Sequence, residues 1–374
     1  MATHLNIVAF NVPYPPNYGG VIDVYYLIET LHRLGVKVLL HCFTRNRDQA
    51  PALERLCEAV WYYPRRTGWR ANLSLLPYNV YGRRDEALLA NLLSNEYPIL
   101  FEGLHTCYYL THPRLSHRQK LVRCGNIEHD YYRAIAAASH GARSKLFHLV
   151  EAARFRCYER VLRSADILLA ISETDARYLS RRYPNEVVCI PAFHQGGETV
   201  TSKTGQSDFI LYHGNLSVPE NERAAEFLLM QVFGHLPYRC VIAGMNPPER
   251  LQAAVAGYPH VVLEANPSDS RLEELVQEAH IHLLITFQPT GLKLKLLHSL
   301  FSGRHVVVNS AMLAGSGLDA ACCIADDPAQ LIAACHRLMH RPFTDAFKAA
   351  RQQILLPTYS NTHQGQRLLA LLHS

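Results

Sequence analysis

The sequence lacks the cysteine patterns of disulfide-rich and zinc-binding proteins. Its ten cysteines are scattered through 374 residues without a C-x-x-C pair, and Cys322 and Cys323 are simply adjacent. A chain of this size can bury a sufficient core without disulfides, so buried reduced thiols are the expectation. The cysteines therefore exclude a small disulfide scaffold and give no indication of a structural metal.

Long apolar runs and a strong charge imbalance are also missing. No apolar stretch approaches the length that crosses a bilayer, and the start, MATHLNIVAFNVP, has no basic region of the kind that opens a signal peptide. The formal charge of +5 is too weak to indicate nucleic-acid binding. It suits an anionic substrate or an anionic membrane surface. We expect a cytoplasmic protein.

What the chain does contain is a repeated alternation of strands and helices. Hydrophobic residues make up 48% and charged residues 18%, an ordinary globular balance. The strand LNIVAFN (5–11) is followed by the glycine-containing loop VPYPPNYGG, an amphipathic helix ending before Gly35, and the strand VKVLLHC. This order is the parallel βαβ unit. Further strands are expected at 59–63, 99–104, 120–124, 166–172 and 186–190, and a long helix at 143–164.

The alternation stops at a polar stretch and then begins again. Residues 194–207, HQGGETVTSKTGQS, are rich in Gly, Ser and Thr and form the best linker candidate. Strands are then expected in FILYHG, YRCVIAG, HVVLEA, IHLLITF and RHVVVNS, with helices between them. We predict two Rossmann-like, doubly wound parallel-sheet α/β domains over 1–193 and 208–355, facing across a cleft. A C-terminal helix over 356–374 is expected to cross back to the first domain.

The sequence does not favour an NAD-dependent oxidoreductase. The first loop has no G-x-G-x-x-G, and no acidic residue closes the second strand, VKVLLHCFT. Both are expected of a dinucleotide-binding domain. A nicotinamide cofactor is therefore not predicted.

The segment ITFQPTGLKLKLLHSL indicates an anion site. It places a strand end, a turn and a helix N-terminus in succession, where free N–H groups and the helix dipole favour negative charge. At 3.6 residues per turn, Gly291, Lys295 and His298 share a face, and Lys293 points toward the rim. The leucines at 292, 296 and 297 can face the core. The alternative is that both lysines extend to solvent.

Four stretches give the chain a family resemblance. They are PYPPNYGGVIDVYYLIETLHRLGVKV, YHGNLSVPENERAAEFLL, VIAGMNP and TGLKLKLLHSLFSGRHVVVN, which includes Gly303 before a strand. In this order they resemble the retaining glycosyltransferases of family 4, which have the two-domain GT-B fold. The resemblance implies a first domain on the acceptor side and a second domain that binds a nucleotide sugar.

The resemblance also shows where this chain departs from the family. Two donor-binding glutamates of the family's helix correspond to Thr290 and His298 here. The arginine and lysine that clamp the donor diphosphate correspond to Asn215 and Asn221, in a turn that opens at Gly214. In one interpretation Lys295, with Lys293, replaces the lost charge and His298 binds the ribose. In the other, the site is catalytically degenerate, and the protein binds a sugar nucleotide or supports a partner enzyme.

Candidate residues of the first domain follow its strands. The backbone of Gly19 and Gly20 can cradle phosphate or acceptor oxygens, although a simple tight turn explains the pair equally well. His105 resembles a family histidine and is a catalytic candidate with Lys295; a structural role is the alternative. Asn126, Glu128 and His129 are acceptor-binding candidates, and Glu128 and His129 can equally be the first turn of a helix.

The resemblance implies a mechanism as well as a fold. In retaining transfer the leaving phosphate helps to deprotonate the acceptor hydroxyl, so no dedicated base is needed. No D-x-D motif of metal-dependent transferases is present, and Asp326-Asp327 before Pro328 indicate a helix start. We therefore expect no metal and no cofactor. The predicted partners are a nucleotide-sugar donor and a glycan, lipid-linked or protein acceptor.

Membrane contact is an open alternative. Residues 143–163 form a basic amphipathic helix, and WYYPRRTGWR interleaves aromatic residues with arginines. Both segments could rest on anionic lipid at the inner face of the membrane. A helix that packs its apolar face on the sheet is the other explanation.

Overall fold

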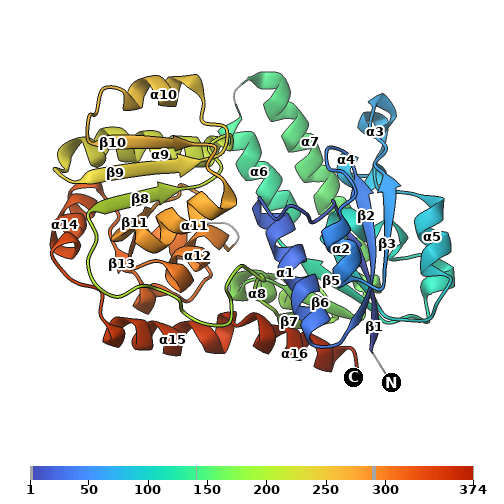
Figure 1. Cartoon of the computed structure of the whole chain (residues 1–374). Coiled ribbons are helices and arrows are strands. Elements are labelled where there is room, and N and C mark those ends of the chain that lie inside the picture. The colour runs from blue at the N-terminus through green and yellow to red at the C-terminus, as the bar shows by residue number, and fades with distance from the viewer. Residues whose placement is uncertain (1–2, 140, 289–291, 374) are drawn as a thin grey trace. The chain divides into compact units, whose positions relative to one another are not determined.

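The computed structural model describes residues 3–139, 141–288 and 292–373, and the chain forms two units (Figure 1). Unit 1 comprises Met1–Phe193 and Asn361–Ser374, and unit 2 comprises His194–Ser360. Each unit is built on its own parallel sheet. The prediction of two doubly wound, Rossmann-like domains is therefore confirmed.

The sheet of unit 1 has seven parallel strands in the order β3-β2-β1-β4-β5-β6-β7. The strands are almost continuously apolar because helices cover both faces of a parallel sheet. The winding reverses between β1 and β4, and ligands of such sheets bind beside that reversal, at the carboxyl ends of the strands. The strands are β1 (His4–Ala9), β2 (Lys37–Thr44), β3 (Ala59–Pro64), β4 (Ile99–Glu102), β5 (Lys120–Cys124), β6 (Ile167–Ala170) and β7 (Glu186–Cys189).

Most helices of unit 1 connect these strands. They are α1 (Gly19–Arg33), α2 (Pro51–Leu56), α3 (Trp69–Leu73), α4 (Tyr78–Tyr81), α5 (Glu86–Leu92), α6 (Glu128–Ala138), α7 (Ala142–Tyr158) and α8 (Glu173–Arg182). The single helix expected over 143–164 is wrong at its end, because α7 stops at Tyr158 and a 3-10 turn continues over Glu159–Ser164.

The sheet of unit 2 has six parallel strands in the order β10-β9-β8-β11-β12-β13, and its winding reverses between β8 and β11. The strands are β8 (Phe209–His213), β9 (Arg239–Gly244), β10 (Val261–Ala265), β11 (Ile281–Leu284), β12 (His305–Val308) and β13 (Cys323–Ile324). The helices are α9 (Pro219–Gln231), α10 (Glu249–Val255), α11 (Asp269–Glu278), α12 (Leu294–Ser302), α13 (Ser310–Leu313), α14 (Pro328–Met339) and α15 (Asp345–Tyr359). Asp327 caps α14 by accepting from the N–H of Gln330, as the helix-start interpretation predicted.

The end of the chain returns to unit 1. The helix expected over 356–374 is divided at Ser360, and α16 (Asn361–Leu371) packs against α1. A Cβ atom at Gly365 would lie 2.7 Å from Cγ2 of Thr30, so the missing side chain lets the two helices approach closely.

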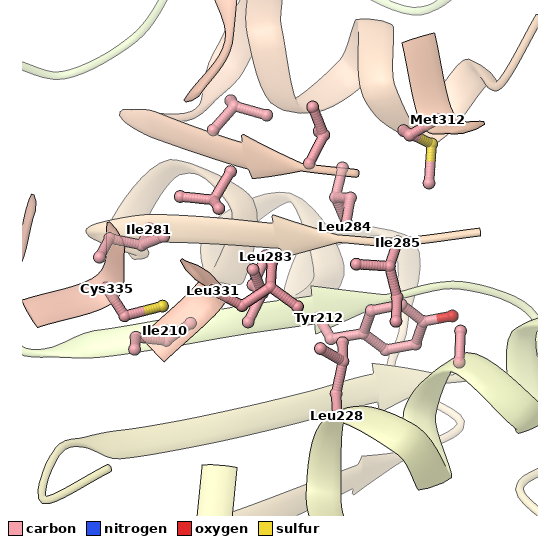
Figure 2. Close-up of a cluster of buried hydrophobic side chains, with 14 of the residues drawn as sticks. Ile210, Tyr212, Leu228, Ile281, Leu283, Leu284, Ile285, Met312, Leu331 and Cys335 are labelled. Carbon is pink, nitrogen blue, oxygen red and sulfur yellow. The ribbon is translucent and has the colours of Figure 1, made fainter. Parts of the chain in front are cut away.

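The polar segment 194–207 lies on unit 2 rather than extending freely. The N–H of Thr201 donates to the carbonyl of Phe301 over 2.7 Å, and the buried hydroxyl of Ser202 donates to the carbonyl of Gly303. Beneath this surface lies a core that includes Tyr212, Leu228 and Ile285 (Figure 2). Within the described part of the chain, no helix is both long and apolar enough to cross a membrane.

Candidate functional site

The predicted donor turn follows β8 at the carboxyl edge of the sheet of unit 2. A Cβ atom at Gly244 would lie 1.9 Å from the carbonyl oxygen of Gly214, so the ends of β8 and β9 meet without side chains between them. Beyond Gly214, the side-chain oxygen of Asn215 accepts from the N–H and the hydroxyl of Ser217, over 3.1 and 2.7 Å. Asn215 therefore shapes the turn before α9.

Asn221 fastens the first turn of α9 to this loop. Its amide Nδ2 donates to the carbonyl of Asn215 over 3.0 Å, and its own carbonyl accepts from the hydroxyl of Tyr212 over 3.0 Å. These bonds leave the side-chain oxygen of Asn221 facing α12. A neutral acceptor thus stands at the position where the family resemblance places a lysine.

Lys295 reaches that acceptor from α12. Its Nζ donates to Oδ1 of Asn221 over 3.0 Å and lies 3.4 Å from the hydroxyl of Tyr212, above the Tyr212 ring. Burial lowers the pKa of the amine to about 8, the nearby Glu220 carboxylate opposes this, and the charge of Lys293 reinforces it. The amine stays protonated at neutral pH but is poorly compensated, which suits it to bind an anion.

Lys293 lies beside Lys295 and not at the rim, so that expectation is wrong. Its side chain is 18% exposed, and its Nζ is 3.9 Å from Oε1 of Glu220. Lys293 is the residue before α12, where it faces the first turn of α9. Glu220 also accepts from the hydroxyl of Thr286, so one carboxylate is shared by Lys293 and a hydroxyl, while its charge also acts on Lys295.

His298 is paired with a carboxylate. Its Nε2 lies 2.7 Å from Oε2 of Glu273 on α11, and this hydrogen bond lowers the pKa of Glu273. The other oxygen of Glu273 accepts from Gln277 over 2.8 Å. The position therefore presents a histidine–glutamate pair in place of a single glutamate. Thr290 and Gly291, the other predicted donor residues of this segment, lie outside the described residues.

The glycine pair of unit 1 opens α1. Gly19 and Gly20 form its first turn after Tyr18, without a side-chain cap or an acidic residue. A Cβ atom at Gly20 would lie 2.7 Å from Cζ of Phe10, which follows β1. The loop therefore holds the uncapped helix N-terminus against the carboxyl end of the central strand, where it favours an anion.

His105 and Glu128 meet at the carboxyl ends of β4 and β5. Nε2 of His105 lies 3.3 Å from Oε2 of Glu128, the first residue of α6. Burial lowers the pKa of His105 to about 3, an effect reinforced by the charges of Arg83 and Arg65. Burial raises the pKa of Glu128 to about 8. The structure thus brings a neutral imidazole and a mostly protonated carboxyl group together.

The other two acceptor candidates lie in the turn before α6 and in its first turn. Asn126 is half-buried in the turn before α6. His129 is buried, and its Nδ1 lies 3.8 Å from Oε2 of Glu159, while its Nε2 lies 3.5 Å from Oδ1 of Asp130. His129 therefore faces carboxylates of its own domain, and its binding of an acceptor remains a prediction.

Several functional candidates were missed from the sequence. In unit 2 they are Tyr212, Glu220 and Glu273, and in unit 1 they are Arg65 and Arg83. The acid in VPEN, beside the expected clamp position, was an available signal for Glu220. The paired arginines in YPRRTG and YGRRDE, each in a loop, were the signal for Arg65 and Arg83. Over the described ranges, no group of three His, Cys, Asp or Glu side chains could hold a metal ion.

Comparison with known proteins connects this geometry to a family. Residues 207–341 match the sequence model of the family described as Glycosyl transferases group 1. An "Uncharacterized 44.6 kDa protein in cps region" of Klebsiella pneumoniae is 27% identical over 336 residues, covering 83% of this chain and 84% of that protein.

Solved structures resemble the whole chain. Sucrose-phosphate synthase from Thermosynechococcus elongatus has a TM-score of 0.70 at 16% identity, covering 99% of this chain and 98% of that chain. The alpha,alpha-trehalose-phosphate synthase (UDP-forming) from Burkholderia xenovorans, in complex with glucose-6-phosphate, has a TM-score of 0.65 at 13% identity and full coverage of both chains, 100% and 100%. A trehalose-6-phosphate structure from E. coli bound with UDP-2-fluoro glucose has a TM-score of 0.63 at 12% identity, covering 99% of each chain.

Proposed function

We propose that this chain, which has the GT-B fold and matches the group 1 glycosyltransferase model over residues 207–341, is a glycosyltransferase that moves a sugar from a nucleotide-sugar donor to a glycan, lipid-linked or protein acceptor. Two similar structures hold ligands of these kinds: UDP-2-fluoro glucose in one and glucose-6-phosphate in another. In this proposal unit 2 binds the nucleotide sugar and unit 1 binds the acceptor.

The observation that supports the proposal best is the placement of Lys295. Its amine bonds to Asn221, the residue that corresponds to the family's clamp lysine. The positive charge expected from α9 is therefore supplied to the same place by α12. Negative charge collects on the departing diphosphate as the sugar–phosphate bond breaks, and fixed cations aimed at that charge lower the barrier. Lys293 adds a second cation beside it.

We further propose that the transfer retains the anomeric configuration and needs no metal. Metal-dependent enzymes use a divalent cation to neutralise the diphosphate, and here two amines are in position to do so. EDTA treatment should leave the rate of transfer unchanged. Loss of transfer on chelation, restored by magnesium or manganese, would contradict the metal-independent part of the proposal.

A donor screen tests the proposed function directly. Thermal shifts with UDP, ADP, GDP and their glucose conjugates should show one preferred nucleotide, because a ligand that binds the native state raises the Tm. Release of that nucleotide from its sugar conjugate should depend on Lys295. Nucleotide binding without any release, with or without an added acceptor extract, would favour the alternative of a degenerate protein that supports a partner enzyme.

Unit 1 carries a surface suited to the proposed membrane contact. The membrane face comprises Trp69, Leu73 and Leu75 around α3 and Leu146, Phe147, Leu149 and Val150 of α7, all of them exposed, with Trp69 at 66% and Leu75 at 95%. Arg154 joins the two segments by donating to the carbonyl of Asn72 over 2.5 Å. Residues 69–76 and 142–150 contain three cations and no acidic residue.

We propose that this membrane face rests on anionic lipid at the cytoplasmic side of the membrane. Apolar and aromatic side chains flanked by cations bind such surfaces, and each nearby cation contributes about 1 kcal/mol. Flotation with phosphatidylglycerol vesicles should retain the protein at low salt, and Leu146→Ser with Phe147→Ser should release it. Failure of the unaltered protein to float removes the membrane contact and leaves the transferase proposal intact.

A further inference from the structure

Six residues at the carboxyl end of the sheet in unit 1 contact one another in a closed circuit. They are Arg83, Asn79, Tyr132, Phe155, His105 and Phe10. Arg83 donates from Nε to the carbonyl of Phe10 over 2.8 Å and from Nη1 to the carbonyl of Asn79 over 2.7 Å. Nδ2 of Asn79 donates to the hydroxyl of Tyr132 over 2.5 Å. The circuit is completed by aromatic contacts from Tyr132 to Phe155, from Phe155 to His105 and from His105 to Phe10.

Two guanidinium groups face this circuit with hydrogen-bond capacity left over. Arg83 is 4% exposed, and no described residue accepts from its Nη2. Arg65 donates from Nη2 to Oδ1 of Asn79, while its Nε is buried without a partner. A buried N–H without an acceptor is costly, so these groups have N–H donors available for an acceptor that the chain does not supply.

The pattern differs from that of a structural arginine in the same unit. Arg118 is 3% exposed, and all three of its nitrogens donate, chiefly to carbonyls of Leu92, Asn95 and Tyr97. Arg118 therefore fastens a loop and is satisfied by it. Arg83 and Arg65 are only partly satisfied, so fastening loops explains some of their hydrogen bonds but not their whole arrangement.

The positive charges of Arg83 and Arg65 at this circuit are also uncompensated. Glu128 lies beside His105 of the circuit, burial raises its pKa to about 8, and no described residue hydrogen-bonds its Oε2. His105 is neutral because burial lowers its pKa to about 3. Burial, reinforced by the charge of Arg65, lowers the pKa of Arg83 to about 9, which still leaves it protonated at neutral pH. Two positive charges thus lack an ionised partner near the N-terminus of α1.

We propose that Arg83 and Arg65 bind a phosphate group of the acceptor, at a site that includes His105. This inference rests on the proposed function, since it assigns unit 1 to the acceptor and specifies the chemical class of that acceptor. A phosphate dianion supplies several hydrogen-bond acceptors and two negative charges, matching the free guanidinium N–H groups. The phosphate is carried either by a soluble sugar or by a lipid.

Binding assays on the full chain test the proposal. Calorimetry with a saturating concentration of the nucleotide that the donor screen selects, which fills the donor site of unit 2, compares glucose 6-phosphate with glucose and dihexanoyl phosphatidic acid with dihexanoyl glycerol. The phosphorylated member of at least one pair should bind at least about tenfold more tightly than its neutral counterpart. The pair that shows the difference identifies the source of the phosphate. Equal or absent binding in both pairs overturns the proposal.

Matched variants exclude a non-specific effect of charge. Arg65→Met should weaken binding of the phosphorylated probe at least about tenfold, and Arg83→Lys should weaken it while preserving the fold better than a neutral residue. Arg66→Met, a neighbouring exposed arginine, should change it less than twofold. Phosphate affinity unchanged by Arg65→Met and Arg83→Lys overturns the proposal. Lys295→Ala should keep the phosphate affinity while losing transfer, so failure of this inference and failure of the proposed function are separately visible.

Discussion

Lys295 on α12 donates a hydrogen bond to the side-chain oxygen of Asn221 on α9, across 3.0 Å. The two residues lie 74 positions apart in the sequence. In the proposed donor site, the cation that the family resemblance places on α9 is therefore supplied from α12. His298 is also paired with a residue of another helix. Its Nε2 lies 2.7 Å from Oε2 of Glu273 on α11, where the family resemblance predicts a single carboxylate. The proposed donor site thus differs from the family pattern in its residues but still contains charged groups of both signs.

The first prediction concerns transfer by variants of Lys295. Lys295→Ala should lower kcat by about 10²-fold or more, because a fixed charge on the departing diphosphate is lost. The double variant Lys295→Ala with Asn221→Lys returns an amine to the same place from α9 and should recover part of the rate. Steady-state kinetics of nucleotide release provides the measurement. A double variant no faster than Lys295→Ala would show that the position of the charge is not what matters.

The second prediction concerns pH. Burial lowers the pKa of Lys295 to about 8 from its ordinary 10.5, so the amine loses its charge as the pH rises through 8. The kcat/KM for the donor, which reports the free enzyme, should fall above pH 8. Lys295→Arg keeps its charge to far higher pH, so any activity it retains should lack this decline. An unaltered enzyme with a flat profile from pH 7 to 9.5 would contradict the assignment.

The fold could be predicted from the sequence because its signal is local. Each strand is a short apolar run, each helix has its own periodicity, and their alternation leaves few topologies. The long helix at 143–164 was wrong because periodicity does not show that the last six residues adopt a 3-10 turn. The exposure of the first half of α7 could not be predicted either. Its apolar residues are exposed, but in the sequence they look like apolar residues that a helix buries.

The candidate site could be predicted in part. Lys295 was found because a lysine in an apolar helix is unusual, and that anomaly is visible within ten residues. Lys293 was placed at the rim because its true neighbour, Glu220, is contributed by another helix. Arg83 and Arg65 each belong to a pair of arginines in a loop, but such arginines are ordinarily solvated, so the pairs did not indicate burial. Their burial depends on Phe10, Asn79 and Tyr132, which only the fold brings together.

The third prediction concerns Gly244. A Cβ atom there would lie 1.9 Å from the backbone oxygen of Gly214, and a backbone atom cannot turn aside as a side chain can. Gly244→Ala should therefore lower the free energy of unfolding by about 1–3 kcal/mol or more and weaken nucleotide binding, because it separates β9 from the donor turn. Gly257→Ala is the matched control, since its Cβ would be 3.5 Å from the nearest atom. Urea denaturation measures the free energy of unfolding of both variants. Equal losses would show that the close approach of Gly244 to the Gly214 carbonyl is unimportant for stability.

The fourth prediction concerns the stability of unit 1 and its dependence on pH. Glu128 is buried beside His105 and Arg83, with the Glu159 carboxylate nearby, and burial raises its pKa to about 8 from 4.5. Between these values the folded state holds a proton that the unfolded state has released, so stability falls as the pH rises from 4.5 to 8. Glu128→Gln cannot ionise and should lose less stability between pH 5 and pH 8, by about 1 kcal/mol or more. His105, whose pKa burial lowers from 6.5 to about 3, contributes the opposite slope below pH 6.5, because there the unfolded chain binds a proton that the folded chain does not, and this contribution is common to Glu128→Gln and the unaltered chain. Urea titrations at the two pH values measure the difference, with the exposed Glu86→Gln as control, and identical losses in Glu128→Gln and the unaltered chain would show that Glu128 is ionised in the folded state.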